Sequence, residues 1–421
     1  MTFLKVDEIE SALVALNNAY PSITQRIRLP NETAEHRWSN ALLIRANPGF
    51  DCRPALIFVS GVHAREWGGP DVLVNLATDL LEAYTMGAGL AYGGKTFTAD
   101  TIRGIVERTD VIVFPDQNPD GRAYSMAAAP GTPQALWRKN RNTASSGGIP
   151  SRIGVDINRN YDFLWDYPVK FAASVSPAST DPASETYRGT GPFSEAETRN
   201  AQWLVDQFPN ARYFLDLHSY SGLVLHPWGD DQNQTTTSTM SFMNAAWDHQ
   251  RGIRNDTYRD YLPSWRLTEL QTAGALMRDA IQAVRGQAYT LQQGFDLYPT
   301  SGTSEDWAFT REFLGRPKLS GFCIEFNKSF TFFPTWPQMV DLIADVDAGL
   351  VALCAHATPG RWAVIWCLVK KWFWAIWKRV WPWDLWGPFG PWVWIREVIG
   401  GVIRTVVSSI VNVVKGIFRR G

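Results

Sequence analysis

The chain has 421 residues, enough for two domains or for one large α/β domain with an appendage. Its apolar fraction of 45% and charged fraction of 19% are ordinary for a globular protein and argue against a disordered chain. Its four cysteines show no C-x-x-C spacing, which excludes a dense disulfide framework but leaves the number of disulfides open.

The net charge of -1 conceals a difference between the two parts of the chain. From Pro359 onward, ten Lys or Arg stand against two acids, so this tail carries +8 and the rest carries -9. Half of the 20 tryptophans also lie in the tail. We therefore predict a globular domain over 1–357 and a tryptophan-rich, basic extension over 358–421.

Four short apolar runs are typical of buried strands, at 55–59, 111–114, 213–217 and 319–324. Helical periodicity predicts helices at about 69–84, 195–208, within 263–285 and at 336–353. Apolar strands that alternate with helices predict a mixed, mainly parallel central α/β sheet with helices on both faces. Stretches rich in Gly, Ser and Pro predict long surface loops at 128–150 and 174–192.

Polar residues stand at the ends of all four predicted strands. His63 follows the first run, Asn118 and its neighbours follow the second, His218 follows the third and Glu325 closes the fourth. Functional groups of open α/β sheets cluster at the carboxyl ends of the strands. We therefore expect these residues to share one site.

His63 and Glu66 lie three residues apart, and His218 follows 152 residues after Glu66. An isolated H-x-x-E pattern recurs by chance and would more often be a pair of surface residues. Two histidines and one glutamate, however, are a ligand set that catalytic zinc sites use, with a fourth position open to water. The third ligand therefore favours a metal site.

The chain resembles the zinc metallocarboxypeptidases of the carboxypeptidase A type, the M14 peptidases. The resemblance covers about residues 5–355 and implies the fold of that family and hydrolysis of C-terminal peptide bonds. It rests on six segments in the same order: Gly61–Trp67, Asn118–Gly121, Leu136–Lys139, Val155–Asn160, His218–Ser221 and Tyr298–Trp307 with Glu325 beyond.

The resemblance implies that His63, Glu66 and His218 hold one Zn²⁺ per chain. It also implies that Asp156 orients the ring of His63, a common support for a metal-bound imidazole.

Two catalytic roles follow from the same resemblance. Glu325 matches the general base that takes a proton from the attacking water and passes it to the leaving amine. Arg138 matches the residue that stabilises the oxyanion of the tetrahedral intermediate.

Substrate recognition is implied at five positions. Asn158 and Arg159 match the pair that binds the free C-terminal carboxylate, for which the planar fork of an arginine is well suited. Tyr298 matches a mobile tyrosine that closes over the terminal residue. Arg65 and Tyr220 match residues of the neighbouring subsites.

Glu305, seven residues after Tyr298, matches the base of the pocket for the terminal side chain. An acid there predicts a preference for C-terminal Lys or Arg by charge pairing. The neighbouring Asp306 leaves an alternative, because a change of one residue in the loop would turn Glu305 toward solvent.

The extension predicts an amphipathic helix. Apolar residues recur every three or four positions from Ile395 to Phe418, with a polar residue on nearly every turn. This argues against a helix that spans a bilayer and fits one that lies in a membrane interface over about 360–420. The alternatives are packing against the catalytic domain or a partner, or a disordered or spurious extension.

The expected partner is a peptide or protein with a free C-terminal carboxylate, and we expect no nucleic-acid partner. The alternatives are a related zinc amidase or deacylase, or a non-catalytic binder of this fold with a membrane-associating tail. The resemblance implies an extracellular enzyme, yet no secretory signal or pro-segment is visible, so either the enzyme is made without them or the sequence lacks its true beginning. Compartment, disulfide state and oligomeric state stay open.

Overall fold

The computed structural model describes residues 2–47, 52–360, 362–364, 366, 367, 369 and 370. Residues up to Thr358 form one compact unit, which contains the elements named in this subsection. The predicted extension and its interface helix lie almost entirely outside the described residues, so the division into these two domains stays a prediction.

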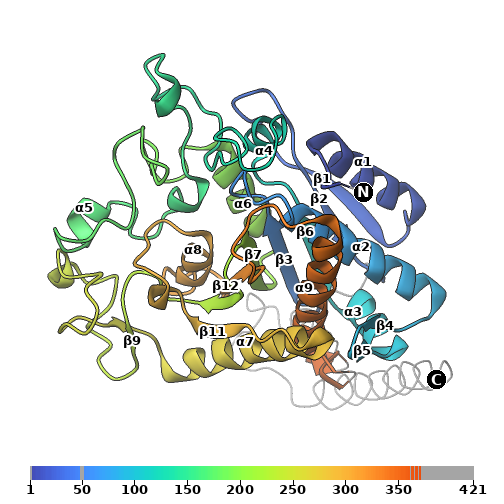
Figure 1. Cartoon of the computed structure of the whole chain (residues 1–421). Helices are drawn as coiled ribbons and strands as arrows, with labels where there is room; N and C mark the ends of the chain where they lie inside the picture. The colour runs from blue at the N-terminus through green and yellow to red at the C-terminus, as the bar shows by residue number, and fades with distance from the viewer. Residues whose placement is uncertain (1, 48–51, 361, 365, 368, 371–421) are drawn as a thin grey trace, which may run out of the picture. The chain divides into compact units, whose positions relative to one another are not determined.

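A central sheet of eight strands runs through this unit (Figure 1). In spatial order the strands are β1 (Thr24–Arg28), β2 (Asn40–Ile44), β6 (Asp110–Phe114), β3 (Ala55–Ser60), β7 (Ala211–Ser219), β12 (Ser320–Phe326), β8 (Leu223–His226) and β11 (Thr290–Gln293). Two further pairs of short strands lie apart from it, β4 (Leu90–Tyr92) with β5 (Lys95–Phe97), and β9 (Asn233–Gln234) with β10 (Asp260–Tyr261).

The four predicted strands are β3, β6, β7 and β12, and they form the parallel centre of the sheet. β3 pairs in parallel with β6 and β7, and β7 pairs in parallel with β12. Antiparallel pairs join β1 to β2, β2 to β6 and β8 to β12. Nearly every residue of the central strands is buried, because both faces of the sheet are covered. The predicted mixed, mainly parallel α/β fold is confirmed.

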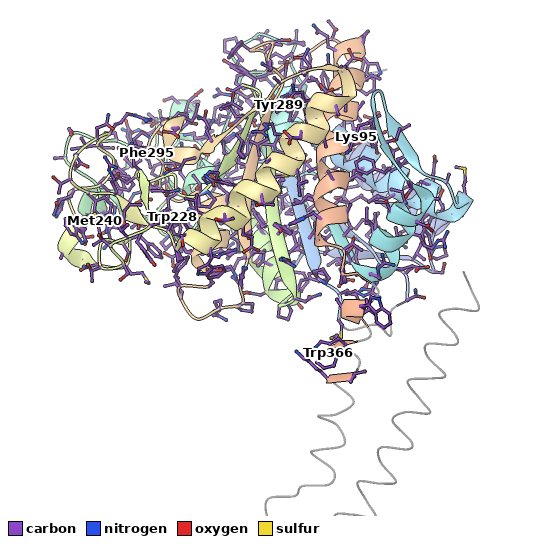
Figure 2. All side chains as sticks on the ribbon, turned by 90° about the horizontal axis from the view of Figure 1, so that it is seen from below. Lys95, Trp228, Met240, Tyr289, Phe295 and Trp366 are labelled. Atoms are coloured by element: carbon purple, nitrogen blue, oxygen red, sulfur yellow. The ribbon has the colours of Figure 1, made fainter. Side chains whose placement is uncertain are left out.

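Helices cover both faces of the sheet (Figures 1 and 2). One face carries the four helices α2 (Gly69–Met86), α3 (Ala99–Arg108), α7 (Ser264–Arg285) and α9 (Trp336–Ala357). The other face carries α6 (Ala196–Gln207) and the short α8 (Ser304–Thr310). The remaining helices are α1 (Val6–Ala19), α4 (Pro119–Met126) and α5 (Tyr167–Lys170).

Local sequence explains where the long helices begin and end. A capping box between Thr335 and Gln338 starts α9, with Pro337 in its first turn. Gly87 ends α2 in the left-handed conformation that glycine adopts most easily. The helices predicted at 69–84, 195–208, 263–285 and 336–353 correspond to α2, α6, α7 and α9.

Aromatic packing fixes α8 against the rest of the unit. The ring of Trp228, labelled in Figure 2, is fully buried and stacks on Phe163 at 5.3 Å. It also contacts Phe309 of α8 at 4.9 Å. On the opposite side of that helix, the ring of Trp307 lies 6.2 Å from Phe214 of β7. The helix is therefore held between the sheet and an aromatic cluster, and its first turn borders a cavity near the end of β12.

None of the described helices is long and apolar enough to cross a membrane.

Candidate metal centre and substrate pocket

A turn after β3 brings His63 and Glu66 to the same side. Gly61 opens the turn with a φ of +70°, and the backbone N–H of Glu66 donates to the carbonyl of His63 at 3.1 Å. The N–H of Ala64 donates to the carbonyl of Arg138 at 3.0 Å, which ties this turn to a distant loop.

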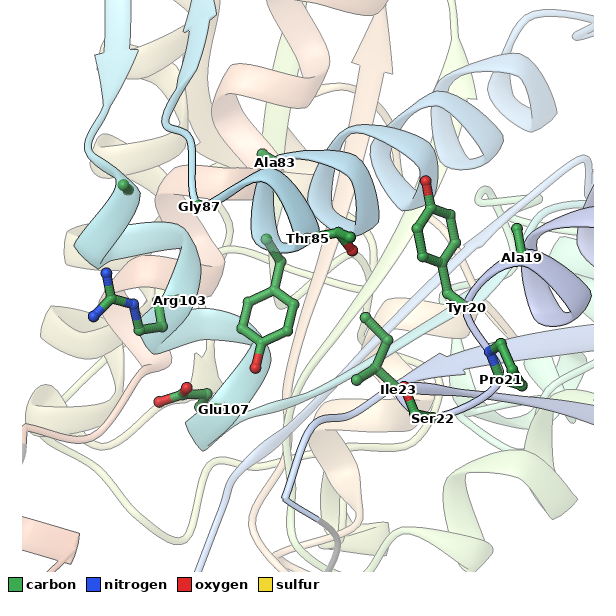
Figure 3. Close-up of a pocket in the computed structure, with 12 residues that line it drawn as sticks. Ala19, Tyr20, Pro21, Ser22, Ile23, Ala83, Thr85, Gly87, Arg103 and Glu107 are labelled. Carbon is green, nitrogen blue, oxygen red and sulfur yellow. The ribbon is translucent and has the colours of Figure 1, made fainter. Parts of the chain in front are cut away.

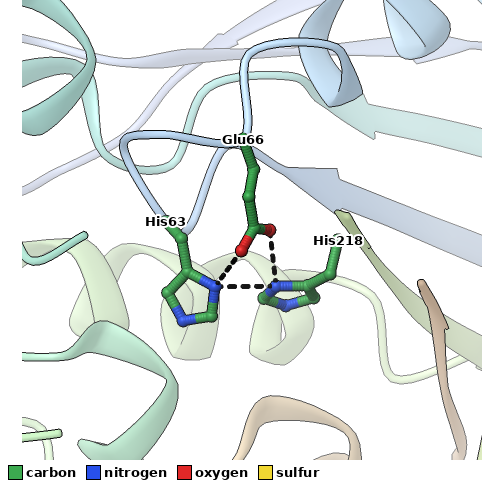
Figure 4. Close-up of side chains that lie close together, drawn as sticks. All are labelled: His63, Glu66 and His218. Atoms are coloured by element: carbon green, nitrogen blue, oxygen red, sulfur yellow. Dashed lines mark hydrogen bonds and ion pairs between the residues drawn. The ribbon is translucent and has the colours of Figure 1, made fainter. Parts of the chain in front are cut away.

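The side chains of His63, Glu66 and His218 converge on one point (Figure 4). His63 Nδ1 lies 2.7 Å from Glu66 Oε1 and 3.0 Å from His218 Nδ1. His218 Nδ1 lies 3.0 Å from Glu66 Oε2. All three residues are buried. Among the described residues, no other group of three or more His, Cys, Asp or Glu side chains lies close enough together to hold a metal ion.

This geometry fits a zinc ion. Zinc binds imidazole nitrogen and carboxylate oxygen at about 2.0–2.1 Å in a tetrahedral arrangement, which separates such ligands by about 3.3 Å. The observed distances between the ligand atoms, 2.7–3.0 Å, are slightly shorter than about 3.3 Å, and the three atoms surround one common point. Three ligands would leave the fourth position open to the pocket.

A buried carboxylate lies behind each histidine. Asp156 Oδ1 is 3.2 Å from His63 Nε2, and Asp216 Oδ2 is 3.1 Å from His218 Nε2. Metal-bound histidines almost always donate their second ring N–H to a carboxylate, a backbone carbonyl or water. The contact of His63 with Asp156 is such a hydrogen bond, and that of His218 with Asp216 is an ion-pair distance. Asp156 is among the residues predicted from the sequence, whereas Asp216 is not. The available signal was an acid within the apolar run of β7, two residues before His218 and hence on the same side of the strand.

Glu325 lies next to the metal ligands at the end of β12, where it is the register partner of His218. Its side chain is only partly buried because it opens into the pocket. Desolvation raises the pKa of Glu325 to about 8; the charge of His218 opposes this rise, and that of Glu66 adds to it.

Arg138 also faces the pocket and is held by Asp156. Its Nε and Nη2 atoms lie 3.1 and 3.0 Å from Asp156 Oδ2. Burial alone would lower the pKa of Arg138, but the negative charges around it, that of Asp156 first among them, together outweigh burial and hold the pKa above its ordinary value. Asp156 therefore links one metal ligand to the cation beside it.

One cavity of about 250 Å³ joins these groups to all six predicted substrate-binding residues. Ten of the residues named from the sequence line it: His63, Arg65, Glu66, Arg138, Asn158, Arg159, Tyr220, Tyr298, Glu305 and Glu325. His218 and Asp156 lie directly behind this wall, in contact with His63.

Asn158 and Arg159 form one side of the cavity. Asn158 Oδ1 accepts a hydrogen bond from the backbone N–H of Ser304 at 2.9 Å, which fixes the orientation of its amide. The Nε atom of Arg159 donates to the carbonyl of Pro177 at 2.8 Å, and its Nη1 atom donates to the carbonyl of Asn158 at 2.6 Å. Both side chains are thus held rigidly where they line the cavity.

Glu305 and Asp306 have different environments although they are adjacent. Glu305, in the first turn of α8, is 7% exposed and lines the cavity, and burial raises its pKa. Asp306 is fully buried and accepts hydrogen bonds from the N–H of Gly229 at 3.0 Å and the hydroxyl of Thr303 at 3.1 Å. Glu305 is therefore the acid of this pair that a ligand in the cavity would meet.

Aromatic side chains surround the entrance. Tyr298 is 46% exposed, as a residue at the rim would be. The guanidinium of Arg65 lies 4.6 Å from the centre of the Phe332 ring, and Tyr220 packs on the same ring at 4.8 Å. Phe332 was not named from the sequence, where it is one of several phenylalanines between positions 326 and 333.

A second hollow of about 450 Å³ lies between the ends of α1, α2 and α3 (Figure 3). It is lined by Tyr20, Tyr84 and Arg103 among others, and none of the three metal-ligand residues borders it. Its size alone gives no reason to place chemistry there.

Comparison with known proteins shows which family the chain resembles. A family model described as zinc carboxypeptidase, peptidase family M14, matches residues 9–343. Carboxypeptidase B of Astacus astacus is 27% identical over 305 residues, which are 72% of this chain and 80% of that protein. The inactive metallocarboxypeptidase ECM14 of Ajellomyces capsulatus is 28% identical over 301 residues, 70% of this chain but 43% of that protein.

Among solved structures, bovine thrombin-activatable fibrinolysis inhibitor in complex with tick carboxypeptidase inhibitor has a TM-score of 0.61 and 20% identity. The match covers 84% of this chain and 97% of the other. This similarity supports the fold.

Proposed function

The chain belongs to the zinc carboxypeptidase family, and we propose that it hydrolyses the C-terminal peptide bond of peptides or proteins at the pocket beside His63, Glu66 and His218. One observation supports this most directly. His63, Glu66, Glu325 and the Asn158–Arg159 side all line one cavity of about 250 Å³, and His218 lies directly behind its wall.

His63, Glu66 and His218 would hold the zinc ion, which when bound supplies a Lewis acid for the scissile carbonyl and lowers the pKa of a water molecule. The chain's own contribution is to fix these ligands. Asp156 lies against the outer nitrogen of the His63 ring and holds its orientation.

Glu325 is proposed as the general base. Its carboxylate takes a proton from the attacking water and returns it to the nitrogen of the leaving amine. The position of Glu325 beside the metal ligands and open to the cavity suits both transfers.

Arg138 is proposed to stabilise the negative charge that develops on the carbonyl oxygen. Its two hydrogen-bonding nitrogens on Asp156 keep the guanidinium charged and in place before the substrate arrives. A donor that needs no rearrangement during the reaction is the more effective one.

Arg159 and Asn158 are proposed to bind the free C-terminal carboxylate, which would restrict the enzyme to the last residue of a chain. Tyr298 at the rim would cover that residue, with Arg65 and Tyr220 beside the preceding ones. This arrangement favours a carboxypeptidase over a zinc amidase or deacylase, whose substrates need not carry that carboxylate.

Glu305 is proposed to select C-terminal Lys or Arg. It is the acid that borders the cavity, while Asp306 is engaged by Gly229 and Thr303.

For the extension, which lies outside most of the described residues, we propose binding to a membrane interface. The support is its sequence, in which tryptophans and basic residues precede an apolar stripe with helical spacing.

The proposed activity is tested with peptides that end in a free carboxylate and with the same peptides amidated at the C-terminus. We expect release of the last residue from the free peptides alone, and we expect a zinc chelator to abolish it. Glu325→Gln should lower kcat by about 10²–10⁴, because the general base is lost while the shape is kept.

Glu197→Gln is the matched control, since Glu197 of α6 is also buried with a pKa raised to about 8 but does not line the cavity. It should leave kcat within about twofold of wild type. Full activity of Glu325→Gln, or release that a chelator does not affect, would reject the proposal.

A further inference from the structure

Asp216 lies behind the metal ligand His218, and Ser304 joins it to the substrate-recognition side of the pocket. We infer that Asp216 is a positioning residue for His218 and that the Ser304 hydroxyl couples this positioning to the wall formed by Asn158 and Glu305. The inference rests on the proposed metal-binding role of His218.

The position of Asp216 is unusual for an acid. It is fully buried in the middle of β7, in a run whose neighbours Leu215 and Leu217 are apolar core residues. A buried carboxylate is unfavourable unless it has a charged or hydrogen-bonding partner. The ring of His218 is such a partner, because Asp216 Oδ2 lies 3.1 Å from its Nε2 atom.

The two nitrogens of the His218 ring face different groups. Nδ1 points at Glu66 and His63, each 3.0 Å away, which is the position of the proposed metal. When Nδ1 binds a cation, the ring proton must lie on Nε2, and we infer that it is shared with the carboxylate of Asp216, which lies at ion-pair distance from that nitrogen. Such an acceptor fixes the tautomer and raises the basicity of the ring as a ligand.

Ser304 connects this pair to the pocket. Its hydroxyl donates to Asp216 Oδ2 at 2.7 Å and lies 3.4 Å from Glu305 Oε2. Its backbone N–H donates to Asn158 Oδ1 at 2.9 Å. Ser304, at the start of α8, therefore contacts three groups of the site. These are Asp216 behind the metal ligand His218, the Asn158 amide proposed to bind the substrate carboxylate, and Glu305 at the base of the pocket.

The opposite side of the metal centre has a similar arrangement. Asp156 contacts His63 through Oδ1 and Arg138 through Oδ2, and it also accepts from the backbone N–H of Asn158 at 3.0 Å. Each histidine is thus backed by an acid that also contacts a substrate-recognition segment. The same arrangement occurs at two separate parts of the chain, with Asp216 in a strand and Asp156 in a loop. This supports a role of the Asp216 contact in positioning His218.

The test measures Zn²⁺ affinity of the full chain by competition with a chromophoric chelator. For Asp216→Asn, which keeps the shape but removes the charge, we expect affinity to fall about 10- to 100-fold. For Ser304→Ala, which removes the hydroxyl and keeps the N–H to Asn158, we expect a smaller fall together with a raised KM. Asp347→Asn is the control, because Asp347 is equally buried but lies in α9 and pairs with Asn75.

Affinity of Asp216→Asn within twofold of wild type, or an equal loss in Asp347→Asn, would overturn the inference. If Asp216→Asn does not fold, proton NMR of the Co²⁺-loaded wild-type protein decides. We expect slowly exchanging ring N–H protons from both His63 and His218, and a rapidly exchanging proton on His218 would overturn the inference.

The two proposals can fail separately. A wild-type chain that releases no C-terminal residue rejects the proposed activity even if Asp216→Asn weakens zinc binding. If the wild-type chain is active and sensitive to a chelator but Asp216→Asn binds zinc as tightly as wild type, only the positioning role of Asp216 is rejected.

Discussion

Neighbouring cationic groups stabilise the ionised form of buried carboxylates in the pocket. Burial alone would raise the pKa of Glu66, but His63 and His218 outweigh it and hold that pKa below its ordinary range. The same holds for Asp156, where Arg138 and His63 oppose the effect of burial. Glu305 differs, because desolvation dominates there and Asp216 adds a like charge, so its pKa is raised. The charges of His218 and Arg159 oppose this rise without cancelling it, and a cationic side chain in the cavity would add a further opposite charge.

Glu305→Gln is therefore expected to lower kcat/KM for peptides with C-terminal Arg by about 10- to 100-fold, the value of one charge-assisted contact of about 1.5–3 kcal/mol. Peptides with C-terminal Phe should be cleaved as well as before, or better. Two peptides that differ only in the last residue give the comparison. A wild-type preference for Phe, or loss of the Arg preference in Asp306→Asn but not in Glu305→Gln, would contradict the assignment.

Among the elements, the contact of α8 with β12 decides the shape of the pocket. A Cβ added to Gly321 of β12 would lie 2.0 Å from the carbonyl oxygen of Glu305. The first turn of α8 can approach the strand this closely only because position 321 has no side chain. That turn carries both Ser304 and Glu305, so its close contact with β12 determines where these two residues lie.

Gly321→Ala is expected to lower the free energy of unfolding by about 1–3 kcal/mol, because the obstructing atoms belong to backbone and cannot rotate away. It should also reduce kcat/KM more than ten times, since Ser304 and Glu305 move with the helix. Thermal unfolding and peptide hydrolysis measure the two effects. Gly191→Ala, where an added Cβ meets nothing within 4 Å, is the control and should change neither. Wild-type behaviour of Gly321→Ala would contradict this view of the contact.

At the scale of the whole molecule, the sheet brings together residues that are far apart in the chain. β3, β7 and β12 are neighbours, so the residues after or near their carboxyl ends meet at one edge. The segment with Asp156 and Asn158 contacts this edge, because Asp156 lies against His63 and Asn158 accepts a hydrogen bond from the backbone N–H of Ser304 in α8. The family match from residue 9 to 343 covers the elements that build the site and leaves out the extension.

Deletion of 371–421 is therefore expected to leave peptide hydrolysis and the unfolding temperature within error of the full chain. If the extension binds a membrane interface, the deletion should abolish co-sedimentation with anionic liposomes. Neutral liposomes show how much of the binding depends on the basic residues. Equal co-sedimentation of both proteins would reject interface binding.

The sequence alone determined the four central strands, four long helices and the zinc carboxypeptidase family, which the family match confirms. Apolar runs and helical spacing are local signals, and so is each motif that carries the resemblance. The sequence did not reveal β1 or α1, because β1 has no fully buried residue and α1 buries only Ile9 and Leu13.

Only the tertiary structure decided which side chains meet. The hydrogen bond of Asp306 with Gly229, away from the cavity, and the approach of Ser304 to Asp216 of β7 depend on how α8 lies on the sheet. That placement follows from Gly321 and the aromatic packing around Trp228, which are contacts between residues of different elements. No local pattern in the sequence encodes such contacts, because they arise from packing after the strands and helices have formed.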